Sequence, residues 1–209
     1  LFRSKWADGK PRFMDPEGKY VMRITNTISL VLAINTDEIK PSDIPTWKSL
    51  LEPKFKGKIS AWDPGIAGTG WNTANYLLRT LGDNYVKKLY IDQQTDVSRD
   101  ARQLSDWLVR NVRPISLGLS GRDIEELKRD GLPAGGVVGL PDAPGHVSGG
   151  FGHVVLMNKA PHPNAAQLFI NWMAMKEGVE IYNRSQSSVG LRTDITNEWA
   201  DRKSTRLNS

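Results

Sequence analysis

The sequence has 209 residues, 39% of them hydrophobic and 24% charged, which is the composition of an ordinary globular protein. It contains no cysteine, so disulfides, thiolate metal sites and thiol catalysis are excluded. The formal net charge is +5, but Arg202, Lys203 and Arg206 lie in the last eight positions, and residues 1–201 carry only +2. Since no basic stripe interleaved with aromatic residues occurs elsewhere, nucleic-acid binding is not expected. No apolar run approaches the roughly 20 residues of a membrane span.

The first part of the chain combines polar turns with one strand-like segment. Residues 1–19 are polar and carry the turn signals Asp-Gly-Lys and Asp-Pro-Glu-Gly. Residues 20–35 are strand-like, and the apolar run 28–34 is typical of a strand buried on both faces. Residues 36–51 pass through turn residues into a short amphipathic piece.

Residues 58–78 predict a strand, a glycine-rich turn and a helix, and this loop is the best candidate for a binding site. The apolar run 58–62 ends at an Asp-Pro-Gly turn, and the glycines that follow allow the backbone to approach a bound group. Thr69 is the expected N-cap of the helix. A helix start presents unpaired N–H groups and the positive end of the dipole, which suits an anion or carboxylate. The alternative is an ordinary turn capped by Thr69.

Neither of two known phosphate loops matches this segment. The glycine order, G-x-x-G-x-G, is the reverse of the dinucleotide fingerprint, and the chain has no Gly-Lys-Ser/Thr run of the nucleoside triphosphate loop. Nucleotide hydrolysis is therefore not expected.

Two helices are predicted next, over residues 83–90 and 100–110, with a polar loop at 93–99 between them. Arg99 and Asp100 stand at the end of this loop. Two roles are possible for these residues: contact with a ligand, or capping of the helix 100–110. The pattern favours capping.

The rest of the chain repeats the strand–turn–helix pattern. A short strand at 114–119 leads through a Ser-Gly-Arg turn into a helix that ends at Gly131. Strands are expected at 135–140 and 151–157, and a long helix at 164–176, followed by another that begins at Gly178. The expected inward-facing residues of the long helix are Leu168, Phe169, Trp172 and Met173.

Alternating short strands and helices predict an α/β architecture with mainly parallel sheets, in which ligands bind at the carboxyl ends of strands. The turns at 68–70 and 120–122 both follow strands, so we expect them to share one cleft. Catalysis has little support: His146, His153 and His162 lack metal-ligand spacing, and the chain has no G-x-S-x-G motif.

Two blocks of the sequence resemble the bacterial solute-binding proteins of ABC importers, in the branch that includes ferric-iron, polyamine, thiamine and phosphonate binders. The first block is INTDEIKPSDIPTWKSLLEPKFKGKISAWDPGIAGTGWNTANYLL. The second is KAPHPNAAQLFINWMAMKEGVEIYNRS, followed by Gly-Leu-Arg-Thr-Asp at 190–194. The resemblance covers residues 20–198.

The resemblance implies a periplasmic-binding-protein-like fold, in which two α/β lobes joined by crossing strands close on a ligand. Residues 1–35 would be a remnant of the first lobe with the first crossing strand, and 36–148 the second lobe. Residues 149–200 would return to the first lobe, crossing at 149–158, while 201–209 read as a non-native tail. Since family members are longer and begin with a signal peptide, we expect one lobe to be incomplete.

The resemblance also implies where the ligand binds and what receives it. Ala67, Gly68 and Thr69 match the family's anion-binding loop, with Gly70 beside them. Arg99 with Asp100, and Ser120 with Arg122, occupy segments that supply further contacts. It implies a monomeric binding protein that is not an enzyme, needs no cofactor, and delivers its solute to a membrane permease from the periplasm or from an anchored extracellular position.

Three alternatives remain open. The first is a ferric-iron-binding member of the same family, the second an α/β enzyme such as a transferase or dehydrogenase, and the third a sensor domain. Many iron-binding relatives use two adjacent tyrosines, which residues 115–122 lack, and Arg122 in that loop favours an anion over a cation. The expected solute is therefore an anionic small molecule or a metal held in an anionic chelate.

Overall fold

The computed structural model describes residues 5–6, 9–29, 32–148, 152–186 and 188–196. Its contacts divide the chain into two compact units. The first unit comprises Leu1–Ile28 and Val147–Ser209, and the second comprises Ser29–His146. The expected crossing residues 149–151 and the tail 201–209 lie outside the described residues.

The second unit is built on a five-stranded sheet with the order β6-β5-β7-β4-β8. The strands are β4 (Leu32–Asn35), β5 (Ile59–Trp62), β6 (Asp96–Ser98), β7 (Ile115–Leu117) and β8 (Ala134–Val137). β5 runs parallel to both β6 and β7, whereas β4 is antiparallel to β7 and β8. The α/β class is as predicted. The expectation of mainly parallel strands did not anticipate the antiparallel β4, because apolar patterning identifies a strand without giving its direction. β4, expected in the crossing segment of the first lobe, pairs within this sheet.

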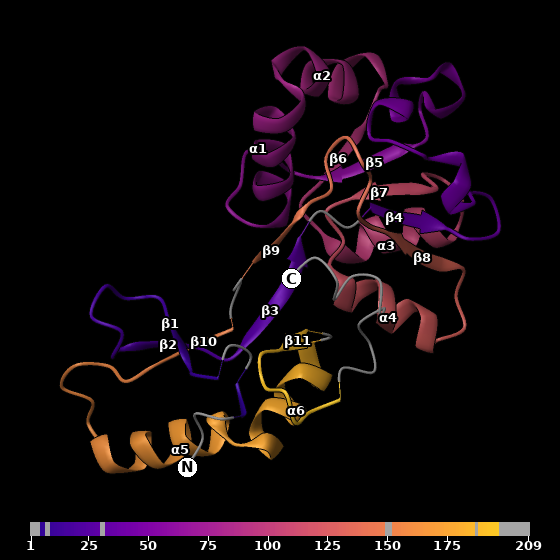
Figure 1. The fold of residues 1–209 in the computed structure, drawn as a ribbon. Helices are drawn as coiled ribbons and strands as arrows, with labels where there is room; N and C mark the ends of the chain where they lie inside the picture. The colour runs from indigo at the N-terminus through magenta and orange to yellow at the C-terminus, as the bar shows by residue number, and fades with distance from the viewer. Residues whose placement is uncertain (1–4, 7–8, 30–31, 149–151, 187, 197–209) are drawn as a thin grey trace. The chain divides into compact units, whose positions relative to one another are not determined.

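Helices cover both faces of this sheet (Figure 1). One face carries α1 (Thr69–Leu81), α2 (Asp83–Lys87) and a π-helical turn η5 (Lys88–Asp92), and the other carries α3 (Ala101–Val109) and α4 (Gly121–Arg129). The predicted helix 83–90 is thus an α-helix that continues as a π-helix. Short 3-10 turns at Pro41–Asp43, Lys48–Leu51 and Pro53–Phe55 join β4 to β5.

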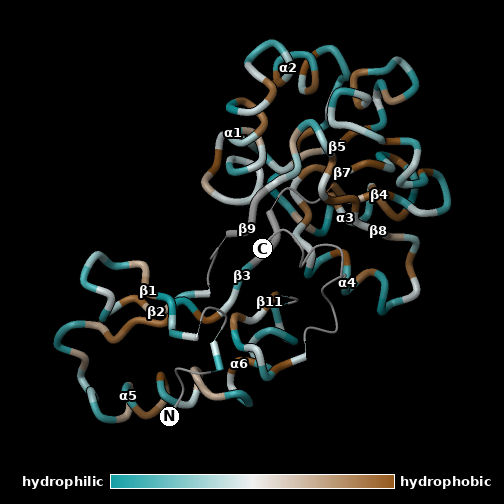
Figure 2. The backbone as a smooth tube through the Cα atoms, in the orientation of Figure 1, coloured by the Kyte–Doolittle hydropathy of each residue, from teal (hydrophilic) through white to brown (hydrophobic). Residues whose placement is uncertain are grey.

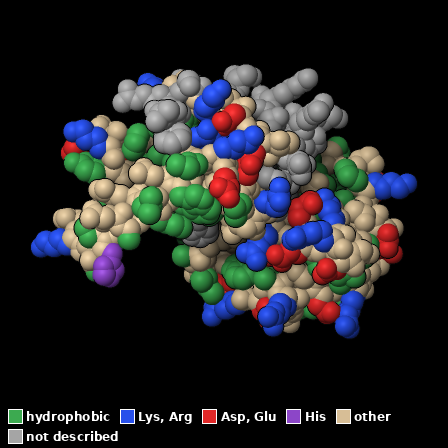
Figure 3. All heavy atoms as spheres, turned by 90° about the horizontal axis from the view of Figure 1, so that it is seen from below, with side chains coloured by type: hydrophobic (Ala, Val, Ile, Leu, Met, Phe, Trp, Pro, Cys, Tyr) green, Lys and Arg blue, Asp and Glu red, His purple; other side chains and the backbone are tan. Residues whose placement is uncertain are grey.

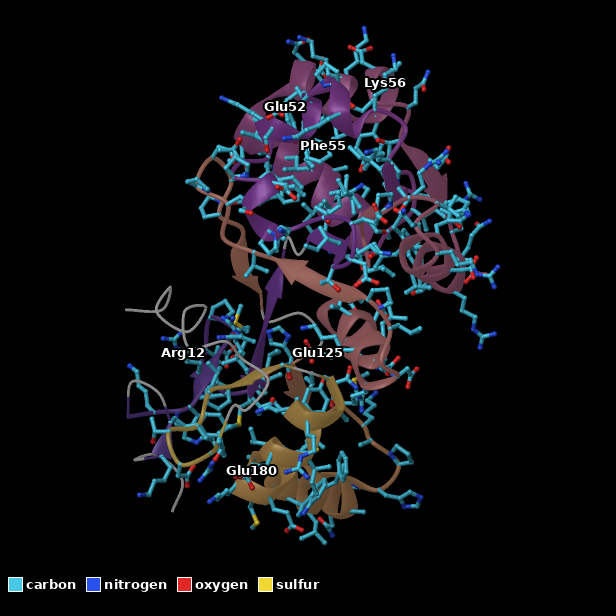
Figure 4. All side chains as sticks on the ribbon, turned by 90° about the vertical axis from the view of Figure 1, so that its right-hand side faces the viewer. Arg12, Glu52, Phe55, Lys56, Glu125 and Glu180 are labelled. Carbon is cyan, nitrogen blue, oxygen red and sulfur yellow. The ribbon has the colours of Figure 1, made fainter. Side chains whose placement is uncertain are left out.

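β4 shows why the sheet is buried on both faces, as its apolar run predicts. Leu32 and Ile34 join the core under α1 and α2, whereas Ala33 joins the core under α3 and α4. Figure 2 shows the central strands in the hydrophobic colours. Trp47 fixes the connecting segment to the first of these cores, since its indole N–H donates to the Ala143 carbonyl at 2.9 Å. Phe55, labelled in Figure 4, is buried in the same core.

In its described residues, the first unit contains two small sheets and two helices. One sheet has the order β1-β2-β10, from Arg12–Phe13, Val21–Arg23 and His153–Val155. The other has the order β11-β3-β9, from Val189–Gly190, Thr25–Ser29 and His146–Ser148, of which Ser29 and His146 are assigned to the second unit. The helices are α5 (Pro163–Ala174) and α6 (Lys176–Gln186). Their core includes Trp6, Ile24 and Val179.

The expected inward face of the helix 164–176 is wrong in part. Met173 packs against the core of the first unit, but Leu168 is 73% exposed and Phe169 is 59% exposed. An apolar groove runs along this exposed side, lined by Ala165, Leu168, Phe169, Asn171, Trp172 and Met175. Seen from below, hydrophobic side chains gather on the surface of the molecule (Figure 3). The helix is apolar around most of its circumference, so periodicity could not separate the two sides.

Candidate functional site

Three loops of the second unit lie at one edge of the sheet. β5, β6 and β7 are parallel neighbours, so their carboxyl ends meet at the same edge. The loops that follow contain residues 63–68, Arg99 with Asp100, and 118–120. Two contacts tie them together: the Asp63 N–H donates to the Ser98 carbonyl at 3.0 Å, and Gly118 packs against Trp62. In α/β sheets this edge is where ligands bind.

The start of α1 differs from the predicted one. Gly68, not Thr69, is the N-cap, and no side chain caps the helix. Gly68 has φ +143°, a conformation that L side chains rarely adopt, so a residue with a capping side chain is disfavoured there. Among the described side chains, none accepts from the first N–H groups of α1, and the positive end of the helix dipole is not offset by an acidic residue in the first turn.

Gly70 allows α1 to begin directly above the end of β5. A Cβ atom at this position would clash with the Trp62 carbonyl oxygen and would lie 2.8 Å from that of Asp63. Only glycine permits this approach. The close packing holds the start of α1, with Ala67 and Thr69 beside it, against the carboxyl end of β5.

Arg99 and Asp63 form an ion pair across the first two loops. The Arg99 Nε lies 2.7 Å from Asp63 Oδ2, while Asp63 Oδ1 accepts the N–H of Gly65 at 2.7 Å. The hydrogen bonds from Arg99 and from the Gly65 N–H lower the pKa of Asp63, so the carboxylate is ionised at neutral pH. The Arg99 side chain is 73% exposed, which leaves its remaining N–H groups accessible to a ligand.

Asp100 caps α3. Its carboxylate accepts the N–H of Arg102 at 2.8 Å, which is the capping geometry favoured by the sequence. The ligand contact of Asp100 stays a prediction.

Ser120 and Arg122 are both engaged by carboxylates of α4. Ser120 forms a capping box with Asp123, whose Oδ2 accepts from the Ser120 N–H and hydroxyl, each at 2.7 Å. Arg122 Nε donates to Glu126 at 2.9 Å, and this hydrogen bond raises the pKa of Arg122. Figure 4 labels Glu125 on the same helix. No hydrogen bond or ion pair joins Arg99 to Ser120 or Arg122 within the described residues, so their joint ligand role stays a prediction.

Two aromatic residues near this loop were not among the predicted site residues. Trp71, in the first turn of α1, is 49% exposed. Tyr90 packs against the core beneath α1, and its buried hydroxyl has no hydrogen-bond partner among the described residues. Burial, with the nearby charge of Asp63, raises the pKa of Tyr90 to about 12. The sequence signal for Trp71 was its place directly after Gly70. No sequence pattern pointed to the π-helix that carries Tyr90.

No group of three or more His, Asp or Glu side chains that could hold a metal is found in the described part of the chain. Two tyrosines of the second unit donate hydrogen bonds to backbone carbonyls. The Tyr85 hydroxyl donates to the Trp47 carbonyl at 2.6 Å and the Tyr76 hydroxyl to the Gly145 carbonyl at 3.2 Å. Among the described helices, none is long and apolar enough to cross a membrane.

The family model of the bacterial extracellular solute-binding proteins matches residues 1–180. An uncharacterized protein of Haemophilus influenzae is 28% identical over 211 residues, an alignment that covers 94% of this chain and 58% of that protein. The chain thus spans less than two thirds of the length of this curated relative.

Several solved structures share the fold. Iron-bound HitA of Pseudomonas aeruginosa has a TM-score of 0.67 at 18% identity, covering 93% of this chain and 67% of its own. The ferric binding protein of Campylobacter jejuni has a TM-score of 0.66 at 14% identity. The match covers 100% of this chain and 66% of that protein's chain. A third structure is the periplasmic binding protein AfuA of Actinobacillus pleuropneumoniae with fructose-6-phosphate bound. It has a TM-score of 0.60 at 24% identity, and the match covers 90% of this chain and 60% of the AfuA chain. With the family match over most of its length, the chain belongs to the bacterial extracellular solute-binding protein family.

Proposed function

We propose that the protein is the substrate-binding component of an ABC importer, which captures a small anionic solute, or a metal in an anionic chelate, between two lobes. It delivers this solute to a membrane permease from the periplasm or from an anchored position outside the cell. The observation that carries the proposal is the family match over residues 1–180. The binding role entails no turnover of the solute.

The start of α1 supports an anionic solute. Its first N–H groups have no side-chain cap, and it lies at the carboxyl edge of three parallel strands. Arg99 adds an exposed guanidinium on the adjacent loop. Backbone N–H groups, a helix dipole and an arginine together favour carboxylates and phosphates. In this proposal Ala67, Gly68, Thr69 and Gly70 form the anion loop, and Arg99 with Asp100 and Ser120 with Arg122 lie around it.

Binding of ferric iron is the second candidate, because HitA and the Campylobacter protein are iron-binding proteins by name. Residues 115–122 contain no tyrosine, and the hydroxyls of Tyr76 and Tyr85 donate to backbone carbonyls. A visible charge-transfer band on stoichiometric addition of ferric iron would identify phenolate ligation and favour this candidate.

A thermal-shift screen tests the proposal. The probes are fructose 6-phosphate, inorganic phosphate, methylphosphonate, ferric citrate, ferric chloride, thiamine and spermidine. A ligand at 100 times its dissociation constant stabilises the protein by about 2.7 kcal/mol. We expect an anionic probe to raise the melting temperature saturably. Arg99→Gln should raise the dissociation constant of that probe about tenfold, since a charged hydrogen bond contributes about 1.5 kcal/mol or more. Arg79→Gln, an exposed arginine on the last turn of α1, is the matched control. Stabilisation by the cationic probes alone, or consumption of a probe, would contradict the proposal.

A further inference from the structure

The helix α5 carries no charged side chain. Its residues, Pro163–Ala174, read PNAAQLFINWMA, so the side that faces water is largely apolar. The next helix, α6, has the composition of an ordinary surface helix: Lys176 pairs with Glu180, which Figure 4 labels, and Val179 is buried. A helix whose apolar residues extend around most of its circumference is typical of one that is buried on most sides.

The groove along α5 has the walls of a packing surface. Leu168 and Phe169 are largely exposed, and the centres of the Phe169 and Trp172 rings lie 5.8 Å apart. Asn171 is the one polar residue among those that line the groove. An exposed groove of aliphatic and aromatic side chains is where another apolar element packs.

The sheets of the first unit are small compared with that of the second. The two described sheets have three strands each, of two to five residues, whereas the second unit has five strands between two helical layers. Val155, in the strand β10 that contacts α5, and Met157 just after it are exposed as well. Sheets of this size depend on packing against further elements for their stability.

The relatives have the additional length that such packing needs. This chain spans 58% of the Haemophilus influenzae protein, and between 60% and 67% of the chains of HitA, AfuA and the Campylobacter protein. In the second unit both faces of the sheet are already covered. The apolar groove that is left uncovered belongs to the first unit.

We propose that the apolar side of α5 is covered by a further segment of this protein's own first lobe, one that lies beyond these 209 residues and corresponds to the additional length of the relatives. The segment packs an apolar face on Leu168, Phe169 and Trp172 and completes the core of the first unit. The surface is therefore an intramolecular one. The proposal rests on the family membership and is independent of the solute.

The test compares the 209-residue chain with the complete product of its gene. Hydrogen exchange at the amides of α5 is measured in both chains by mass spectrometry. We expect exchange in α5 to be at least about tenfold slower in the longer chain, because a covered helix opens only together with the unit around it. The helix α3 of the second unit is the internal control and should exchange at similar rates in both chains.

Replacing both Leu168 and Phe169 by serine supplies a second readout. In the 209-residue chain both side chains face water, so the melting temperature should change by less than about 1 °C. In the longer chain the same double variant should lower it by about 5 °C or more, because it removes two side chains from a core. Ile181→Ser is the matched control, since Ile181 is exposed on α6 outside the groove, and it should be neutral in both chains.

Light scattering identifies the other possible occupant, a second copy of this chain. A dimer of the 209-residue chain in which the α5 amides are already protected would assign the groove to that copy and overturn the proposal. Equal exchange in both chains, a double variant that is neutral in the longer chain, or a gene that encodes no further residues would overturn it too. The exchange comparison needs no variant, so it decides even where the double variant does not fold.

Discussion

Gly70 is the residue that sets the position of α1. The effect of replacing it on stability can be compared with that of replacing a second glycine at a helix start. Gly70→Ala places a methyl group against the carbonyls of Trp62 and Asp63, so we expect a loss of about 2 kcal/mol in the free energy of unfolding. Gly121, at the first position of α4, has open space around its Cβ position. Gly121→Ala should be neutral or should stabilise by a few tenths of a kcal/mol. Denaturant unfolding followed by tryptophan fluorescence compares the two, and equal effects would contradict the packing of α1 on β5.

Asp15 makes a pH-dependent contribution to the stability of the fold. Hydrogen bonds from the backbone N–H groups of Lys19, Val21 and Tyr20 lower its pKa to about 2. The unfolded chain has a pKa of about 3.9, so this stabilisation is present above that pH and is lost as the pH falls towards 2. The difference in unfolding free energy between the protein and Asp15→Asn should therefore shrink between pH 5 and pH 2. A difference that stays constant over this range would show that the charge of Asp15 contributes nothing.

The sequence predicted the glycine-rich turn but misplaced its cap. Thr69 has the side chain of a capping residue, yet Gly68 takes that position because φ +143° requires glycine. Propensity favours the hydroxyl, and the backbone angle overrides it. Arg99 was assigned to a loop near a helix start, but its pairing with Asp63, 36 residues away, depends on the strand order, which residue spacing does not reveal.

At the scale of elements, α3 and α4 begin with side-chain caps that the sequence allowed. Asp100→Ala should lower the free energy of unfolding by about 1 kcal/mol, since it removes the acceptor of the Arg102 N–H. Asp100→Asn should restore most of the loss, because asparagine caps as well as aspartate. Urea unfolding of both variants checks this. If asparagine is as harmful as alanine, the charge of Asp100 has a role beyond capping.

Arg192 joins the turn after β11 to the end of α5. It pairs with Asp194 through two hydrogen bonds of 2.9 and 2.8 Å and donates to the Ala174 carbonyl at 2.9 Å. Its guanidinium also lies 5.6 Å from the centre of the Trp6 ring. Since Arg192 is only 6% exposed, Arg192→Ala should cost about 3 kcal/mol. Arg184→Ala, on the exposed side of α6, should cost less than about 0.5 kcal/mol, and a similar loss from both would contradict the anchoring role.

At the scale of the whole molecule, alternating apolar and polar segments were enough to predict the α/β class. They could not give the antiparallel direction of β4, because direction depends on which strands become neighbours. The exposed side of α5 is the other departure. A helix apolar on nearly every side leaves its orientation to packing, and packing is not visible in the order of residues.

The exposed side of α5 should bind a dye that reports apolar surface. Leu168 and Phe169 line its groove and are largely exposed. Replacing both by serine should reduce the fluorescence of 8-anilinonaphthalene-1-sulfonate with little loss of stability, whereas Met173→Ser should destabilise the first unit. Unchanged fluorescence in the double variant would show that another surface binds the dye.

We expect an anionic solute to bind at the start of α1. The most direct measurement is the amide NMR spectrum of the protein during titration with the anionic probe that gives the largest thermal shift. We expect the amide signals of Thr69, Gly70 and Trp71 to move saturably, with the same midpoint as the thermal shift, and we expect Arg99→Gln to move this midpoint to higher concentration. Amide signals at the start of α1 that stay fixed while the probe binds and stabilises the protein would contradict it.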